Sequence, residues 1–205
     1  MTKFRNYLGQ LRLYSLVDLI LMVMAYGLNV REMLGATVLW VAFLATLEDA
    51  HRHKGRWEIP DTWPMGFMAG GLLIFGHAAS GYVFAIFSVL YCFKNRPRWA
   101  LVSPLFRGLQ TAALIWTHAA WPGLLLAGSL ITVRNVLGDA RDTSKDGAVG
   151  MLTWPVLLNW SDHKYLHLIA VMTTSGIWCA IANFSPILLA GVWILQLATY
   201  WLTPR

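Results

Sequence analysis

The chain has little charge and almost no cysteine. Of its 205 residues only 13% are charged and 57% are hydrophobic, whereas about a quarter of the residues in a soluble domain carry a charge. These proportions, with a mean hydropathy of +0.53 and eleven tryptophans, argue against a soluble globular domain and against a disordered chain. The two cysteines, Cys92 and Cys179, lie inside apolar runs, so no disulfide is predicted.

A composition of this kind is typical of an integral membrane protein, and apolar segments recur along the whole chain. They cover residues 13–29, 33–47, 65–93, 100–118, 121–133, 165–182 and 186–202. As one helix, segment 65–93 would be about 43 Å long, which exceeds a hydrocarbon core of about 30 Å. The net charge of +6 indicates loops that face a cytoplasmic membrane surface, and nucleic acid is not an expected partner.

The basic residues indicate how segment 65–93 crosses the membrane. Short cytoplasmic loops collect Lys and Arg, and a hairpin turning near residues 77–81 places nearly all basic clusters on the side of both termini. These clusters lie at 52–56, 94–107, 134–145 and 164, with Arg31 alone on the other side. We therefore predict an all-α fold: a polytopic transmembrane bundle of about eight helices, one domain over residues 1–205. Both termini are expected to be cytoplasmic, in an inner or plasma membrane.

The few acidic residues are clustered at the predicted cytoplasmic boundary. Glu48 and Asp49 end the second apolar segment, and Asp139, Asp142 and Asp146 follow the sixth. If residues 139–146 are helical, their spacing puts three carboxylates on one face, where a cation would relieve the repulsion. Magnesium commonly binds one or two carboxylates together with phosphate oxygens, which suits a lipid diphosphate. The alternative is a solvated acidic stripe in an ordinary loop, offset by Arg141 and Lys145.

Residues 135–156, NVLGDARDTSKDGAVGMLTWPV, carry a more specific signal. They resemble the second aspartate-rich motif of the UbiA-type intramembrane prenyltransferase superfamily, D-x-x-D-x-x-x-D-x-x-x-G-x-x-T-x-P-V. Every specified position is filled, by Asp139, Asp142, Asp146, Gly150, Thr153, Pro155 and Val156. Two other stretches resemble the family more weakly. They are Leu11-Arg12-Leu13 before the first segment, and Tyr91-Cys92-Phe93-Lys94 with Arg96.

The resemblance implies a UbiA-like, magnesium-dependent enzyme embedded in membrane lipid. Such an enzyme moves a polyprenyl group from a polyprenyl diphosphate donor to an aromatic or lipid acceptor. The catalytic residues it implies are Asp139, Asp142 and Asp146, which would also bind Mg²⁺ together with Glu48 and Asp49. The residues it implies for diphosphate binding are Arg12, Arg56, Lys94 and Lys145.

The chain departs from the family in two places. The first motif, N-D-x-x-D-x-x-x-D, retains Asp49, but Glu48 replaces the Asn, and Arg52 and Arg56 stand at the next two Asp positions. Alternatively the loop is shorter, and Arg56, Ile59 and Pro60 correspond to the family's R-P-I-P run. One helix of the usual nine is also missing, which would leave one flank open or filled by a homo-oligomer or another helix-supplying partner. A catalytically silent relative that binds isoprenoid diphosphate, or scaffolds a pathway, is therefore the alternative function.

The remaining polar residues of the apolar segments have plainer interpretations. Asp18 is either a functional acid or a side chain that reaches interfacial water. His77 and His118 are expected at the outer interface, away from the proposed site. Asn29, Gln110, Asn183 and Gln196 are expected to form interhelical hydrogen bonds. The spacing of the acids does not fit a CDP-alcohol phosphotransferase, and no internal repeat points to a transporter.

Overall fold

The computed structural model contains helices and connecting turns, and no strand, in the part of the chain that it describes, which comprises residues 12–51, 60, 62–96 and 98–202. Side chains are described for all of these except Glu48, Asp49, His51, Asn95 and Lys164. The elements are α2 (Leu13–Ala25), α3 (Val30–His51), α4 (Thr62–Phe75), α5 (Ala78–Cys92), the 3₁₀ turn η1 (Phe93–Asn95), α6 (Trp99–Ile115), α7 (Trp121–Asp139), α8 (Thr143–Ala148), α9 (Trp154–Leu157), α10 (Lys164–Ile181) and α11 (Pro186–Leu202). The all-α prediction is thus confirmed.

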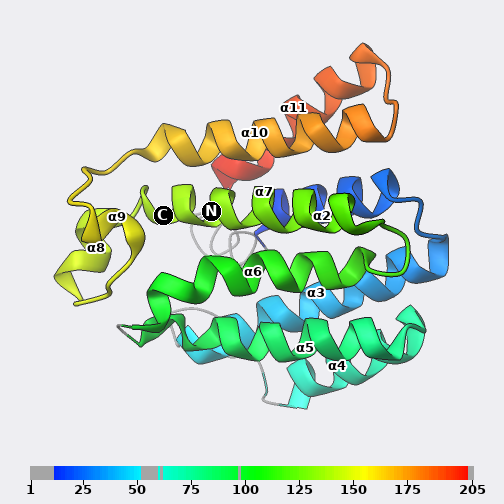
Figure 1. The fold of residues 1–205 in the computed structure, drawn as a ribbon, viewed down its shortest axis with the longest axis horizontal. Coiled ribbons are helices and arrows are strands. Elements are labelled where there is room, and N and C mark those ends of the chain that lie inside the picture. The colour runs from blue at the N-terminus through cyan, green and yellow to red at the C-terminus, as the bar shows by residue number, and fades with distance from the viewer. Residues whose placement is uncertain (1–11, 52–59, 61, 97, 203–205) are drawn as a thin grey trace.

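The eight long helices of the described residues lie side by side and alternate in direction (Figure 1). The beginning of α2 and the end of α11 lie at the same end of the bundle as α8, α9 and the end of α3. We call this the aspartate end. The turns that join α2 to α3, α4 to α5, α6 to α7 and α10 to α11 lie at the opposite end.

Segment 65–93 forms a hairpin, as the distribution of basic residues predicts. The helix α4 ends at Phe75 and α5 begins at Ala78. Gly76 closes α4 with a φ of 80°, a left-handed conformation that glycine adopts without the steric cost of a Cβ. The turn therefore comes at residues 76–77, at the start of the predicted range.

Close helix contacts hold the bundle together at small residues. A Cβ on Gly108 of α6 would overlap the carbonyl oxygen of Gly128 in α7, and one on Gly71 of α4 would lie 2.9 Å from the backbone nitrogen of Leu39 in α3. Around these contacts lies an aromatic and aliphatic core, whose largest fully buried members include Trp40 and Trp178. Small-residue contacts of this kind are typical of helices that pack without help from the hydrophobic effect.

One helix of the described residues is long and apolar enough by itself to cross a membrane, namely α3 over Val30–Leu47. Five shorter apolar helices accompany it: Leu13–Ala25, Thr62–Phe75, Ala78–Cys92, Tyr165–Ile181 and Pro186–Leu202. At about 1.5 Å per residue, a helix of seventeen residues such as α11 is about 25 Å long, somewhat less than a hydrocarbon core.

Candidate active site

The clearest convergence at the aspartate end joins Lys94 and Asp139. The helix α7 ends at Asp139, and η1 carries Lys94 to the same place. The ammonium of Lys94 forms an ion pair with Asp139 Oδ1, and both side chains are largely withdrawn from solvent. The second oxygen, Oδ2, is buried and has no hydrogen-bond partner among the described residues. A buried carboxylate oxygen without a partner is costly, so this oxygen is available to a ligand.

The stretch 139–146, which we call the aspartate turn, differs from the continuous helix that the spacing suggests. The helix α7 stops at Asp139, residues 140–142 form a turn, and α8 begins at Thr143. The amide of Asp142 donates to the carbonyl of Asp139 at 3.0 Å, and the amide of Asp146 donates to the carbonyl of Asp142 at 2.9 Å. Because residues 140–142 are not helical, the condition for three carboxylates on one helical face is not met.

The three aspartates of this turn have different surroundings. The carboxylates of Asp139 and Asp146 are buried, whereas the side chain of Asp142 is 34% exposed. One oxygen of Asp142 accepts two hydrogen bonds from the guanidinium of Arg141, at 2.6 and 3.1 Å. Asp139 and Asp146 are therefore directed into the protein, and Asp142 lies at its rim.

Asp146 is electrostatically coupled to its neighbours. Burial, followed by the negative charges of Asp139 and Asp142, raises the pKa of its carboxyl to about 6, although Lys94 and Lys145 act in the opposite sense. Burial lowers the pKa of the Lys94 ammonium, but the carboxylates of Asp139 and Asp146 more than reverse that effect. These groups form one charge cluster, whose protonation a cation or an anionic ligand would change.

Behind this cluster lies a buried polar zone between the helices. Asp18 of α2 forms an ion pair with Arg134 of α7, and both side chains are at most 4% exposed. The guanidinium of Arg107 in α6 lies 3.8 Å from the ring centroid of Trp40 and 4.2 Å from that of Phe43. No carboxylate of the described residues pairs with Arg107. This zone is thus rich in positive charge and in aromatic faces.

Two assignments of the basic residues have to be corrected here. The charge pattern placed Arg107 and Arg134 in cytoplasmic loops, but they belong to α6 and α7 and are 5% and 4% exposed. Asp18 does not reach interfacial water, because Arg134 binds it inside the bundle. Arg107 and Arg134 are the site-forming side chains that sequence reasoning missed, and a charged residue in or beside an apolar run is the signal that marks them.

The remaining predicted site residues are in part at the aspartate end and in part outside the described residues. Arg12 precedes α2 at the aspartate end, is partly buried, and lies close enough to Arg107 to interact with it electrostatically. Lys145 is exposed on α8. Glu48 and Asp49 belong to the last turns of α3, which end at the aspartate end (Figure 1), but their side chains lie outside the description. Arg56 lies outside the described residues altogether.

An apolar groove of about 540 Å³ runs along α5, α6 and α7. Its lining residues are Val83, Phe87, Leu105, Leu109, Ala112, Ala113, Trp116, Trp121, Leu124, Leu125, Gly128, Ser129, Thr132 and Val133. Thr132 and Asp139 are seven residues apart on α7, so they lie on nearly the same helical face, about 10 Å apart along the axis. The α7 wall of the groove therefore ends about two helical turns before Asp139.

The structure also tests the predictions for the amide side chains and for the two histidines of the apolar segments. Gln110 donates to Ser88 Oγ at 2.5 Å and Gln196 donates to Ser175 Oγ at 2.7 Å, which confirms both as interhelical hydrogen-bonding residues. Asn29 instead exchanges hydrogen bonds with Glu32 at the start of α3, so the expectation for this residue is wrong. His77 and His118 lie at the opposite end from the aspartate turn, but they are not isolated interface residues: both contact Glu32.

Comparison of the chain with known protein families, with curated proteins and with solved structures gives no match. The resemblance to the UbiA-type superfamily therefore rests on the motif residues themselves.

Proposed function

We propose that this protein is a membrane-embedded, magnesium-dependent prenyltransferase of the UbiA type. The observation that carries the proposal is the contact between Lys94 and Asp139 beside the buried Asp146. Lys94 belongs to one stretch that resembles the family and the two aspartates belong to another, 45 residues further along the chain. A lysine and two buried carboxylates suit the diphosphate head of a lipid substrate.

Membrane embedding is supported by the surface of the bundle. Large apolar side chains are exposed on several helices, among them Leu73 at 77%, Trp121 at 70% and Ile194 at 71%. An aqueous surface rarely carries apolar side chains so densely, whereas the acyl chains of a bilayer solvate them well. We place the protein in an inner or plasma membrane, with both termini and the aspartate end on the cytoplasmic side.

The carboxylates of Asp139 and Asp146 are the protein ligands that a magnesium ion would use here. Asp139 Oδ2 is a buried oxygen without a partner among the described residues, and Asp146 is a second buried carboxylate in the same charge cluster. Magnesium needs only one or two carboxylates when substrate phosphates and water supply its other ligands. Asp139 and Asp146 would hold the ion, with Asp142 at the rim. When bound, it neutralises charge on the departing diphosphate.

The cationic side chains would bind and orient the diphosphate. Lys94 would exchange its partner Asp139 for a phosphate oxygen, and Arg12 and Lys145 would contact oxygens at the rim. The pyrophosphate leaves with the bonding electron pair, and the allylic cation that remains bonds to a nucleophilic acceptor, which releases a proton. The aromatic faces of Trp40, Phe43 and Tyr91 surround the guanidinium of Arg107, a buried cation that would attract the diphosphate.

The groove along α5, α6 and α7 would receive the polyprenyl chain. Its walls are apolar apart from Ser129 and Thr132, and it opens toward the surface that we place in lipid. A lipid diphosphate could enter sideways from the bilayer with its head at the aspartate end. An acceptor, aromatic or lipid, would approach from the same membrane phase.

A catalytically silent diphosphate-binding or scaffolding protein is the second candidate. The observation that favours it is the pairing of two motif aspartates with cations of the chain itself, Asp139 with Lys94 and Asp142 with Arg141. A protein that only binds a diphosphate needs the cations more than the carboxylates. The two candidates make the same prediction for binding and opposite predictions for turnover.

Purified protein in lipid nanodiscs separates the two candidates. Binding of geranylgeranyl thiodiphosphate, a slowly reacting donor analogue, and transfer from labelled geranylgeranyl diphosphate to a panel of acceptors are measured in parallel. Lys94→Met should weaken binding about tenfold or more, because it removes a charge-assisted contact, while Arg98→Met, an exposed cation nearby, should not. Binding without transfer would favour the silent protein, and equal binding by all variants would refute both.

A further inference from the structure

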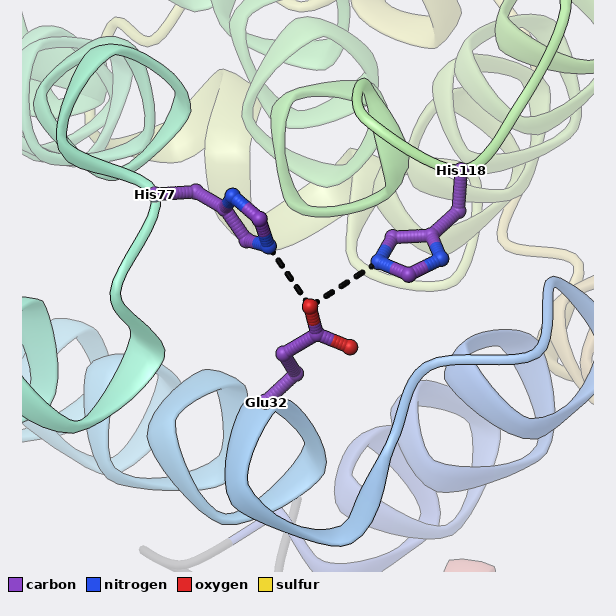
Figure 2. A group of neighbouring side chains, drawn as sticks. All are labelled: Glu32, His77 and His118. Carbon is purple, nitrogen blue, oxygen red and sulfur yellow. Dashed lines mark hydrogen bonds and ion pairs between the residues drawn. The ribbon is translucent and has the colours of Figure 1, made fainter.

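The opposite end of the bundle holds a second, unrelated cluster (Figure 2). Glu32 of α3, His77 between α4 and α5, and His118 between α6 and α7 direct their side chains toward one point. The Oε1 atom of Glu32 lies 2.6 Å from Nε2 of His77 and 3.1 Å from Nε2 of His118. The potential ligand atoms of the three side chains all lie within 4.8 Å of one another.

The carboxylate of Glu32 is held in place by the start of its own helix. The backbone amide of Asn29 donates to Glu32 Oε2 at 2.8 Å, and the amide of Glu32 donates to Asn29 Oδ1 at 3.0 Å. This reciprocal pair is a capping box, which satisfies amides at the helix N-terminus. It occupies Oε2 and leaves Oε1 facing the histidines, as an outer hydrogen bond does for a metal-ligating carboxylate.

His77 is positioned by contacts that do not involve its own imidazole nitrogens. The guanidinium of Arg31 donates to the carbonyls of Ile74 at 3.0 Å and Leu73 at 3.2 Å. These bonds fasten the end of α4 to the beginning of α3, and the ring edge of Phe75 packs against His77 with centroids 5.4 Å apart. The turn would therefore present His77 to Glu32 even if their mutual contact were lost.

His118 reaches the cluster from the turn after α6. The amide of His118 donates to the carbonyl of Ile115 at 3.0 Å, and the amide of Ala119 donates to the same carbonyl at 2.8 Å. The imidazole rings of His77 and His118 lie 5.9 Å apart at 82°, so they approach the carboxylate from two directions. Three turns that are distant in the sequence thus supply one side chain each.

We propose that Glu32, His77 and His118 bind a divalent transition-metal ion of the zinc type. Two imidazole nitrogens and one carboxylate oxygen are a ligand set that zinc uses when its fourth position is left to water. Zinc–ligand bonds of about 2.0–2.1 Å in a tetrahedron place the ligand atoms about 3.3 Å apart. The separations of 2.6 and 3.1 Å need only a small widening when the ion replaces the bridging protons.

Exposure and chemistry both fit such an ion. The side chain of Glu32 is 8% exposed, while those of His77 and His118 are 33% and 24% exposed. The carboxylate thus forms the floor of the site, and the open side would supply the water ligand. Magnesium prefers oxygen ligands, so it should not compete for this site. The ion would link the start of α3 to the turns after α4 and α6, at the end of the bundle opposite the aspartate turn. This inference does not depend on the proposed prenyl transfer.

The test uses the full-length protein, purified without a histidine tag and stripped with a chelator. Calorimetric titration with Zn²⁺ should show one site per chain, and excess Mg²⁺ should not displace the ion. Co²⁺ at the same site should give the visible absorption of a tetrahedral cobalt ion. Zn²⁺ should also raise the thermal unfolding midpoint, because the metal binds the folded chain.

Three variants and a control decide the outcome. His77→Ala, His118→Ala and Glu32→Gln should each weaken Zn²⁺ binding by at least about tenfold, while His163→Ala should leave it unchanged. His163 is exposed, lies between α9 and α10 and contacts Ser161. If Glu32→Gln does not fold, the two histidine variants, checked by their metal-free unfolding midpoints, still decide. Absence of saturable Zn²⁺ binding by the wild type, or an equal loss in His163→Ala, would overturn the proposal.

Discussion

The guanidinium of Arg107 lies over the indole ring of Trp40, 3.8 Å from its centroid, inside the helical bundle. The side chain is 5% exposed, and its hydrogen-bond partners are the neutral groups of Gln110 and Ser15. Aromatic faces stabilise a desolvated cation by about 2 kcal/mol, which is less than the cost of burying it. We interpret Arg107 as a cation kept in the bundle to attract an anionic ligand.

Replacement of Arg107 should therefore separate stability from ligand binding. In Arg107→Met the apolar side chain fills the same space, and the unfolding midpoint should stay unchanged or rise. The affinity for a prenyl diphosphate analogue should fall about tenfold, because one charge is lost. Calorimetry in nanodiscs measures both quantities, with Arg98→Met as the exposed control. An unchanged affinity would show that Arg107 has only a structural role.

The buried pair of Asp18 and Arg134 should behave differently. Asp18→Asn removes the negative partner and leaves the guanidinium of Arg134 buried without a countercharge. Breaking such a pair from one side costs about 3–5 kcal/mol. The double variant Asp18→Leu/Arg134→Met, which leaves no unpaired charge, should be more stable than Asp18→Asn. Unfolding free energies in mixed detergent micelles measure this order, and the reverse order would contradict the assigned ion pair.

The contact between α6 and α7 predicts a sensitive glycine. Gly108→Ala adds a Cβ where the carbonyl of Gly128 already lies, and overpacking of this kind costs about 1–3 kcal/mol. The matched control is Gly66→Ala in α4, where a Cβ meets nothing within 4 Å and alanine favours the helix by about 0.5–1 kcal/mol. Thermal unfolding should shift in opposite directions for the two variants. Equal shifts would argue against the close packing of α6 on α7.

The stability of the metal-free protein should depend on pH through Asp146. Burial raises the pKa of its carboxyl to about 6, so the folded chain holds a proton that the unfolded chain has already lost. The contribution to stability is complete below about pH 4 and disappears as the pH rises through 6. Asp146→Asn should lack this component, and comparison of its unfolding free energies with those of the wild type between pH 4 and 7 isolates it. Parallel curves for the two proteins would contradict the assignment.

The sequence was a good guide to the helices and a poor one to the charged residues within them. The hairpin at residues 76–77 was predictable because basic loops flank it on both sides and Gly76 permits the turn. The distribution of basic residues alone does not reveal the burial of Arg107 and Arg134, and the signal for it is their position in or beside an apolar segment. The sequence left open whether residues 139–146 are helical, because the spacing of aspartates does not report where a helix ends, and the structure ends α7 at Asp139.

The metal cluster illustrates the same limit. Glu32, His77 and His118 belong to three turns that approach only when α3, α4 and α6 pack, and no local pattern links them. Lys94 and Asp139 were linked in advance only through the resemblance of two separate stretches to one family. Side chains that contact one another across 45 residues become a site through packing, which periodicity does not encode.

The central claim is that the aspartate end transfers a prenyl group. The most direct measurement is the formation of labelled prenyl product and free pyrophosphate by the protein in lipid vesicles, with labelled geranylgeranyl diphosphate, an aromatic acceptor panel and Mg²⁺. We predict product with the wild type and with Asp162→Asn, an exposed carboxylate that only accepts from Ser144, and a loss of about a hundredfold or more in Asp146→Asn. Equal product formation by Asp146→Asn and the wild type would contradict the account. So would the absence of product from the wild type under all of these conditions.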